Sequence, residues 1–596
     1  MSTLPERKNV KATDAWNLAS LYPSEGAWEK AFEEFKQNIP TLGSFKGQLA
    51  ESPEKFKECL DFYFSHEELG ERLGYYSFLR FNEDAGDSKN QGRQNRYMQS
   101  AVQADSEISY LRPEIQALSQ DTLEKYLDNP SLERYRIFLT KLARFRPHIL
   151  SPNEERALAM AGEANQTAQK AFGALTDVDL DFGKIQTPEG EKELTQSSYG
   201  SLIQHEDRKV RENSFVQFHK GFEVHKNTLA ALYTGSIQLD VYQAKIRNFS
   251  SSLEAALFPD QVSKNVYTNL VETVRNHLPT LHKYYALRSR VLSQKPLQLW
   301  DTKVSLLSSV KVVTPYDKAV DTIISALAPL GDEYCSVLKK GLTGGWVDKY
   351  ENKGKRSGAF SAGSFYGDPY ILMNYKDDVL RDVFTLAHEA GHSMHSWYSG
   401  KNNPFPHYQY TIFEAEVAST FNEQLLFAHL MKEAKTPEMK SYLLNKQIDD
   451  ILATLYRQTM FAEYELKVHE MAEAGEPITV DSLREEYSNL LEAYFGPEVL
   501  LHDYADLEGL RIPHFYRAFY VYKYATGISA SISLSTRVVE GGANEREQYF
   551  AFLKSGGSSF PIESLKKAGV DMSRPEPIVR ALDLFDSYVQ QLDALL

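Results

Sequence analysis

The stretch His388-Glu389-Ala390-Gly391-His392 contains two histidines four residues apart, with a glutamate directly after the first. On an α-helix, residues i and i+4 lie on the same face, so both imidazoles can bind one metal ion. Glu389 then lies beside the water that such an ion holds, where a carboxylate can act as a general base. This HExxH spacing is typical of zinc metallopeptidases.

The residues around the motif predict a buried amphipathic helix. Carboxylates gather at its N-terminal end, where the helix dipole favours negative charge. Apolar side chains recur at helical spacing along it: Val379, Val383, Leu386, Ala390, Met394 and Trp397. The alternative is a core helix in which the two histidines only satisfy each other's hydrogen bonds.

A tetrahedral zinc site needs a third protein ligand. His395 would lie about 10 Å from His388 along the helix axis, which is too far, so we expect it to pack or to lie outside the ligand shell. Glu416, among small neighbours on the next acidic helix, is the expected ligand. Glu423 lies two turns further along the same face and is expected to orient a ligand histidine. Glu414 points elsewhere.

Residues 388–399 (HEAGHSMHSWYS) and 413–423 (FEAEVASTFNE) resemble the oligoendopeptidase F branch of the M3, thimet oligopeptidase-like, metallopeptidases. Segments 354–375 and 512–527 resemble the same family. The resemblance implies a mainly α-helical gluzincin fold, with a small β-sheet beside the zinc helix and a deep substrate channel. It also implies one Zn²⁺ ion as cofactor and short unfolded peptides as substrates.

Residues 345–375 are expected to form that small sheet. Tyr370 to Tyr375 is an apolar run of strand character, and the preceding glycines, Gly354, Gly358, Gly363 and Gly367, permit unusual backbone dihedral angles. An exposed edge strand can hold an extended peptide through main-chain hydrogen bonds. The alternative is an ordinary hairpin that covers the core.

The tyrosine-rich segment 512–527 offers donors for the negative charge that builds on a scissile carbonyl oxygen. His514, Tyr520 and Tyr524 are the expected donors, because residues 520 and 524 share one face of a helix. Tyr516 and Tyr522 remain alternatives. The alternative for the whole segment is an aromatic core stripe.

The composition agrees with a soluble intracellular enzyme. The 596 residues carry a formal charge of −15, which argues against nucleic acid as a partner. The N-terminus lacks the apolar region of a signal peptide, and no run is long enough to span a membrane. Two cysteines, Cys59 and Cys335, suit the reducing cytoplasm. The oligomeric state stays open.

Three regions are expected along the chain: an N-terminal helical region (1–112), an oligoendopeptidase F-type N-terminal domain (113–200) and an M3-type catalytic domain (201–596). Ser52 followed by Pro53 predicts the start of a helix. The alternation in Thr176 to Phe182 predicts a strand.

The sequence therefore predicts a zinc-dependent endopeptidase that hydrolyses internal bonds of short peptides. One alternative is a metallocarboxypeptidase or dipeptidyl carboxypeptidase, in which Arg511, Arg517 or Lys523 recognises a free C-terminal carboxylate. The other is a peptide-binding protein without activity. Glu389, which pure metal binding does not need, argues against it.

Overall fold

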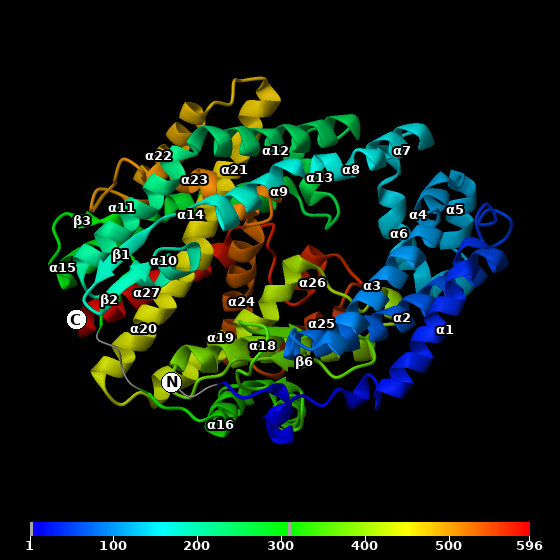
Figure 1. Cartoon of the computed structure of the whole chain (residues 1–596), viewed down its shortest axis with the longest axis horizontal. Coiled ribbons are helices and arrows are strands. Elements are labelled where there is room, and N and C mark those ends of the chain that lie inside the picture. Colours follow the sequence, from blue (N-terminus) through cyan, green and yellow to red (C-terminus); the bar gives the residue numbers. More distant parts are fainter. Residues whose placement is uncertain (1–3, 308–311) are drawn as a thin grey trace. The chain divides into compact units, whose positions relative to one another are not determined.

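The computed structural model describes residues 4–307 and 312–596. The chain is mainly α-helical with a few short strands, as the sequence predicted (Figure 1). It forms two compact units from interleaved segments. Unit 1 comprises Met1–Arg146, Lys311–Lys432 and Ser531–Val570, and unit 2 comprises Pro147–Val310, Glu433–Ala530 and Asp571–Leu596. The expected division at residues 112 and 200 stays a prediction.

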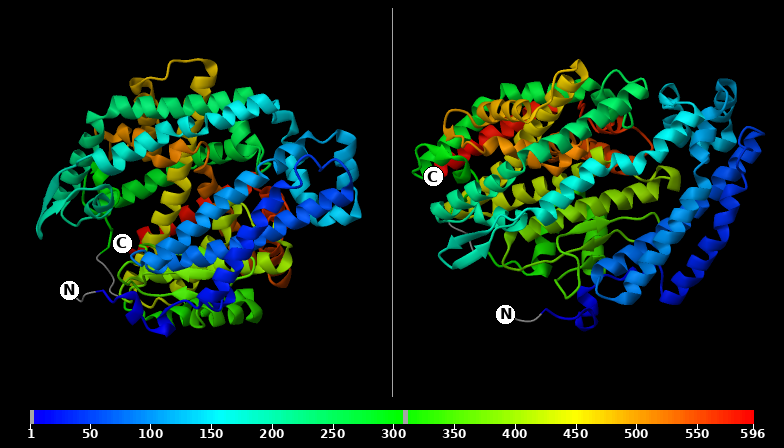
Figure 2. Two further views of the ribbon diagram at one scale, coloured as in Figure 1. Left: turned by 45° about the vertical axis from the view of Figure 1, so that its right-hand side comes forward. Right: turned by 45° about the horizontal axis from the view of Figure 1, so that its top comes forward.

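Three long helices lie side by side in unit 1: α1 (Glu25–Gly43), α2 (Pro53–Glu83) and α3 (Ser88–Ile108) (Figures 1 and 2). Helix α2 begins as predicted, because Ser52 Oγ accepts a hydrogen bond from the Lys55 amide at 3.1 Å. The apolar faces of the three helices share one core with residues of the sheet. The other helices of unit 1 are α4 (Leu111–Ala117), α5 (Gln120–Leu127), α6 (Arg136–Arg144), α16 (Tyr316–Ala326), α17 (Asp332–Thr343), α18 (Leu380–Asn402), α19 (Ile412–Glu433), α25 (Ala543–Ser555) and α26 (Pro561–Lys567).

The predicted sheet is present in unit 1 as three short strands in the order β4-β6-β5. The central strand β6 (Tyr370–Leu372) pairs in parallel with β4 (Val347–Asp348) and antiparallel with β5 (Phe360–Ala362). The run at 370–375 therefore supplies the central strand and not an exposed edge strand, because Tyr370–Leu372 is buried between β4 and β5. In the described part of the chain, no strand pairs with the outer edge of β5.

The glycines of this segment have two different roles. Gly354 and Gly358 have positive φ angles of 81° and 85°, as expected. Gly363 has no positive φ angle, and a Cβ atom added there would lie 2.2 Å from Cβ of Ser396 on α18. Gly363 is therefore needed for the close packing of the sheet on that helix.

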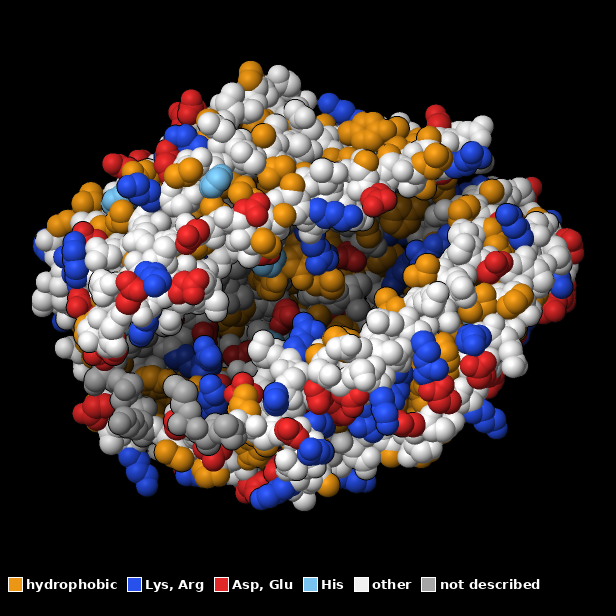
Figure 3. Space-filling model, in the orientation of Figure 1, with side chains coloured by type: hydrophobic (Ala, Val, Ile, Leu, Met, Phe, Trp, Pro, Cys, Tyr) orange, Lys and Arg blue, Asp and Glu red, His pale blue; other side chains and the backbone are white. Residues whose placement is uncertain are grey.

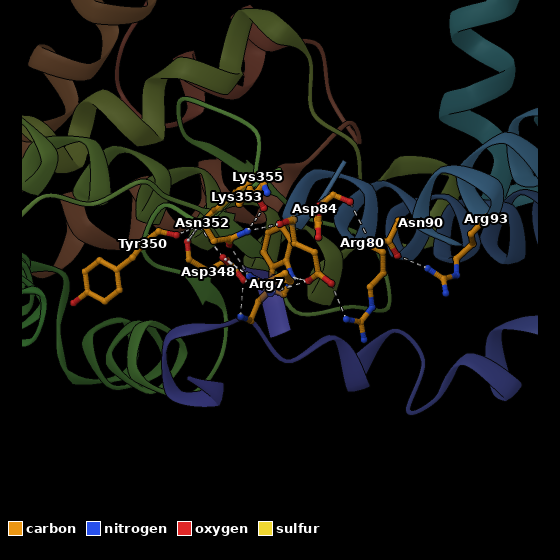
Figure 4. A network of polar contacts seen from close by, with 12 residues as sticks. Arg7, Arg80, Asp84, Asn90, Arg93, Asp348, Tyr350, Asn352, Lys353 and Lys355 are labelled. Atoms are coloured by element: carbon orange, nitrogen blue, oxygen red, sulfur yellow. Dashed lines mark hydrogen bonds and ion pairs between the residues drawn. The ribbon is translucent and has the colours of Figure 1, made fainter. Parts of the chain in front are cut away.

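A buried ionic network joins the N-terminal segment to β4 (Figure 4). Asp348 accepts hydrogen bonds from Arg7 at 2.5 and 2.9 Å, and its carboxylate lies 2.7 Å from Nζ of Lys355. The side chains of Asp348 and Lys355 are both 0% exposed. Arg7 also donates to Glu83 at the end of α2. The network thus ties the sheet to α2 and to the start of the chain.

Helices α18 and α19 approach each other at Gly391. A Cβ atom at this position would lie 2.4 Å from the carbonyl oxygen of Ala418 and 2.6 Å from Cα of Ser419. Both are backbone atoms and cannot rotate away. Only glycine allows this separation of the two helices.

Unit 2 is also mainly helical. Its helices are α7 (Pro152–Met160), α8 (Gly162–Asn165), α9 (Thr167–Ala174), α10 (Gln196–Leu202), α11 (Arg208–Val224), α12 (Lys226–Ile246), α13 (Ser252–Leu257), α14 (Lys264–Asn276), α15 (Leu278–Val291), α20 (Pro437–Ile451), α21 (Arg457–Ala474), α22 (Val480–Phe495), α23 (Glu508–Arg511) and α27 (Glu576–Leu595), while α24 (Tyr522–Glu540) belongs partly to each unit. Two-stranded pairs are formed by β1 (Lys184–Thr187) with β2 (Gly190–Glu193) and by β3 (Leu297–Gln298) with β7 (Val499–Leu500).

The strand predicted at 176–182 was wrong. Residues Leu175–Asp179 continue α9 as a π-helical turn, in which the Thr176 hydroxyl donates to the Phe172 carbonyl at 3.0 Å. Val178, one of the apolar positions of the alternation, is 78% exposed. The strand β1 begins only at Lys184.

The surface carries mixed charge, and acidic and basic side chains are interspersed over the face in Figure 3. Among the described helices, none combines the length and apolar character needed to cross a bilayer. Cys59 and Cys335 are both free thiols.

We predict that Asp348→Asn lowers the free energy of unfolding by about 3–5 kcal/mol, because it leaves the buried Lys355 ammonium without its carboxylate. Urea unfolding followed by circular dichroism measures the change. The control is Asp321→Asn, which removes an exposed pair with Lys339 and should cost under about 1 kcal/mol. Equal effects of the two substitutions would contradict the prediction.

We predict that Gly391→Ala destabilises unit 1 by about 1–3 kcal/mol or more, because its methyl group overlaps the backbone of α19. Gly400→Ala on the same helix is the control, since its Cβ atom would meet only the Phe365 carbonyl oxygen at 3.7 Å. Thermal unfolding should separate the two variants. Unchanged stability of Gly391→Ala would show that the helices can move apart freely.

Candidate metal centre

The three predicted ligands converge in unit 1. His388 and His392 project from α18, and Glu416 projects from α19. Nε2 of His388 lies 3.2 Å from Nε2 of His392 and 3.4 Å from Oε2 of Glu416, and the His392 Nε2 to Glu416 Oε2 distance is 3.7 Å. The two histidines therefore do more than satisfy each other's hydrogen bonds, because the Glu416 carboxylate completes a group of three possible metal ligands.

The amphipathic pattern explains the placement of the two helices. The predicted apolar positions of α18 from Val383 to Met394 are buried, and Val379 and Trp397 at its ends are partly buried. On α19, Phe413 and Val417 are buried on either side of Glu416. The close contact at Gly391 brings the glutamate to the histidine pair.

Glu423 contacts the second ring nitrogen of His388 and so orients the ring, as predicted. Its Oε1 lies 2.7 Å from Nδ1 of His388. A proton held on Nδ1 by this carboxylate leaves the Nε2 lone pair directed at the other two groups. Burial opposes the ionisation of Glu416, but the two neighbouring histidines lower its pKa to about 2.

Glu389 lies between the two histidines and next to the sheet. It is 7% exposed, and the backbone amide of Ser361 in β5 faces its carboxylate. Burial raises the pKa of Glu389 to about 7. The side chain is thus a buried carboxylate that is oriented from the strand side.

Two neighbouring groups lie outside the ligand set. His395 stacks on Tyr410 with ring centroids 3.7 Å apart, and neither ring nitrogen has a hydrogen-bond partner among the described residues. Burial lowers the pKa of His395 to about 3, so it packs as a neutral ring, as expected. Glu414 turns back to accept hydrogen bonds from the amide and hydroxyl of Thr411.

An open pocket of about 590 Å³ borders the free edge of β5. One wall is Phe360, Ser361 and Ala362 of the strand. The other comes from α2 and α3 and includes Tyr75, Phe78, Tyr97 and Met98. The sequence reasoning missed this wall, because these side chains belong to ordinary amphipathic helices and carry no motif.

His514, Tyr520 and Tyr524 lie in unit 2, where their rings form a cluster with centroids 5.5–6.1 Å apart. The helix argument for them was wrong, because α24 begins at Tyr522 and Tyr520 precedes it. A turn with positive φ at Phe519 brings Tyr520 back to Tyr524. Their role as donors to the substrate carbonyl stays a prediction.

The other two tyrosines of the segment pack within unit 2. The ring of Tyr522 lies against Tyr267, and that of Tyr516 lies against Phe172 and Tyr233. Aromatic neighbours therefore account for the packing of both rings.

The three cations considered for carboxylate recognition have different surroundings. Lys523 pairs with Asp260 at 2.9 Å, and Arg517 lies over the ring of Tyr520. Arg511 pairs with Glu508 at 3.0 Å and lines a cavity of unit 2. The three side chains do not form one anion site.

Comparison with known proteins identifies the family. The model of peptidase family M3 matches residues 201–584, and the oligopeptidase F model matches residues 114–182. The chain is 40% identical to oligopeptidase PepF of Bacillus subtilis over 100% of this chain and 89% of that protein. It is 39% identical to the oligoendopeptidase F homolog of Borreliella burgdorferi, over 98% of this chain and 99% of the relative.

A solved structure agrees. The crystal structure of oligoendopeptidase-F from Enterococcus faecium superimposes with a TM-score of 0.75 at 31% identity, covering 95% of this chain and 98% of that one. Family M3 implies a metal cofactor, and the His-His-Glu group of unit 1 has the donor types that such a cofactor needs. The chain therefore belongs to peptidase family M3, in its oligoendopeptidase F branch, and is a metalloendopeptidase.

Proposed function

We propose that this metalloendopeptidase uses one Zn²⁺ ion to hydrolyse internal bonds of short unfolded peptides. The observation that carries the proposal is the convergence of His388, His392 and Glu416, with Glu389 beside them, in a chain of family M3. Free cysteines suit a reducing compartment, so we also propose a cytoplasmic location.

The donor group fits zinc. Ligands at 2.0–2.1 Å from a tetrahedral zinc ion are separated by about 3.3–3.4 Å. The three separations of 3.2, 3.4 and 3.7 Å are close to that value. Two neutral imidazoles and one carboxylate also match the donor set of catalytic zinc sites, which leave one position open. When bound, zinc supplies a Lewis acid and lowers the pKa of its water.

Glu389 is the proposed general base. It lies within the same helix as the two histidines, and its buried carboxylate is held from the β5 side. It accepts a proton from the attacking water and then passes it to the amine that leaves. An activated water attacks the carbonyl directly, so no acyl-enzyme forms.

The free edge of β5 is the proposed peptide-binding strand. An extended peptide can pair with this edge through main-chain hydrogen bonds, which do not depend on side-chain identity. The bordering pocket, with its tyrosine, phenylalanine and methionine walls, can hold apolar side chains of the same peptide. Ser361 belongs to this edge and also faces Glu389, so a peptide bound here lies next to the general base.

Glu389→Gln tests the proposed base. The substitution keeps the shape of the side chain and removes proton transfer, so we predict that cleavage falls by at least about 10²–10⁴-fold while metal content is unchanged. The substrate is a peptide blocked at both ends, and mass spectrometry locates internal cuts. Glu333→Gln, at an exposed position on α17, is the control. Near wild-type cleavage by purified Glu389→Gln would overturn the mechanism.

Glu416 and Glu423 of α19 should differ in their effect on metal retention. We predict that Glu416→Gln loses zinc, because a neutral amide replaces the carboxylate ligand, and that Glu423→Gln binds zinc about 10–100-fold more weakly, because the amide weakens only the contact that orients His388. Competition with a chelator, followed by metal analysis, measures both affinities. The ligand assignment is wrong if Glu416→Gln retains zinc and Glu423→Gln does not.

A further inference from the structure

Unit 2 contains a half-enclosed cavity of about 290 Å³ that the peptidase reaction does not use. Its walls come from α10, α11, α21, α22 and α23 and from the segment around Thr302. Most of the lining is apolar and includes Tyr199, Ile203, Phe215, Leu491 and Phe495. A space of this size and character suits a small ligand with an apolar part.

The charged groups in the wall are unbalanced. Lys303, Arg457 and Arg511 line the cavity together with a single carboxylate, Glu508. Both oxygens of Glu508 are already engaged: Oε2 accepts from Arg457 at 2.5 Å and from Tyr487 at 2.8 Å, and Oε1 accepts from Arg511 at 3.0 Å. Three cations against one carboxylate leave an excess of positive charge.

Two of these cations have unused donors. Nε of Arg511 is buried and has no hydrogen-bond partner in the described part of the chain. Lys303 lines the same cavity, is exposed, and has no ion pair or hydrogen bond with any described residue. A buried donor without a partner is rare in proteins, so Nε of Arg511 is expected to meet an acceptor, and the exposed ammonium of Lys303 can contact the same group.

The nearby acids do not supply that acceptor. Asp449 accepts from Tyr284 at 2.7 Å and from Asn445 at 2.8 Å, and Asp301 is paired with Arg208 and Arg211. His219 in the wall is neutral at pH 7, because burial lowers its pKa to about 4. The cavity therefore combines free cationic donors with apolar walls.

We propose that this cavity is a binding site for an organic carboxylate with an apolar side chain, held by Lys303 and Arg511. The carboxylate accepts hydrogen bonds from the ammonium and the guanidinium, and the apolar side chain lies against the aromatic wall. The walls favour such a ligand over inorganic phosphate, which has no apolar part. The source of the carboxylate is either the C-terminal residue of a peptide or a free small acid.

Calorimetric titration of the full chain with N-acetyl-leucine tests the proposal. Binding should be lost when the probe is N-acetyl-leucinamide and should be much weaker for inorganic phosphate. A parallel titration in the presence of a chelator tests for binding at the metal centre. We expect the same affinity for N-acetyl-leucine with and without the chelator. No binding of N-acetyl-leucine, or equal binding of its amide, would overturn the proposal.

Two variants locate the site. Lys303→Met should weaken binding about tenfold to a hundredfold, the usual effect of a lost charge-assisted hydrogen bond, and it leaves no ion partner behind. Gly200 lies in the cavity wall on α10, and a Cβ atom there meets nothing within 4 Å. Gly200→Leu should therefore fill the cavity and block binding without destabilising the fold. Lys220→Met, an exposed position on α11, is the control.

The proposal fails if either Lys303→Met or Gly200→Leu binds N-acetyl-leucine within twofold of the wild type. The tripeptide Ala-Ala-Leu, measured in the Glu389→Gln background to prevent hydrolysis, distinguishes the two sources. Tighter binding of the tripeptide than of N-acetyl-leucine identifies a peptide C-terminus, and weaker binding identifies a free acid. These titrations require no hydrolysis, so their result is independent of the peptidase mechanism proposed above.

Discussion

The metal centre depends on the close approach of α18 and α19 at Gly391. Two histidines on one helix can supply only two ligands, so the third must come from another element, and its carboxylate must reach within a few ångströms of both rings. The missing side chain of Gly391 lets the backbone of α19 approach at Ala418 and Ser419. Glu416 and Glu423 lie on either side of this contact along α19. The Glu416 carboxylate therefore completes the donor group, and the Glu423 carboxylate orients His388 through Nδ1.

The sequence was sufficient to place these side chains within each helix because their spacing depends on helical periodicity. The spacing of His388 and His392 places both rings on one face, and the seven-position separation of Glu416 and Glu423 places both carboxylates on one face of the next helix. Within a regular helix, sequence distance gives spatial distance directly. The same rule excluded His395 from the ligands, and the structure places it against Tyr410.

Prediction failed where the chain departs from regular structure. Tyr520 and Tyr524 are neighbours, but a turn at Phe519 causes this, because the helix begins only at Tyr522. The alternation at 176–182 is genuine in the sequence, yet a π-helical turn continues α9 through it. The strand Tyr370–Leu372 was recognised, but its place in the centre of the sheet depends on pairing with β4 and β5. Such long-range pairing leaves no local signal.

The cavity of unit 2 is a second feature that the sequence alone could not predict. Its cations are Lys303, Arg457 and Arg511, which are spread over residues 303–511 and share no motif. Arg511 alone was noticed, as a candidate for carboxylate recognition. Its pairing with Glu508 would argue against that role if the pair were isolated. The unbalanced positive charge arises only because folding adds Lys303 and Arg457 around the same carboxylate. Charge balance in a cavity is thus a property of the fold, and the unpaired donors of Lys303 and Arg511 become visible only when every neighbouring acceptor is accounted for.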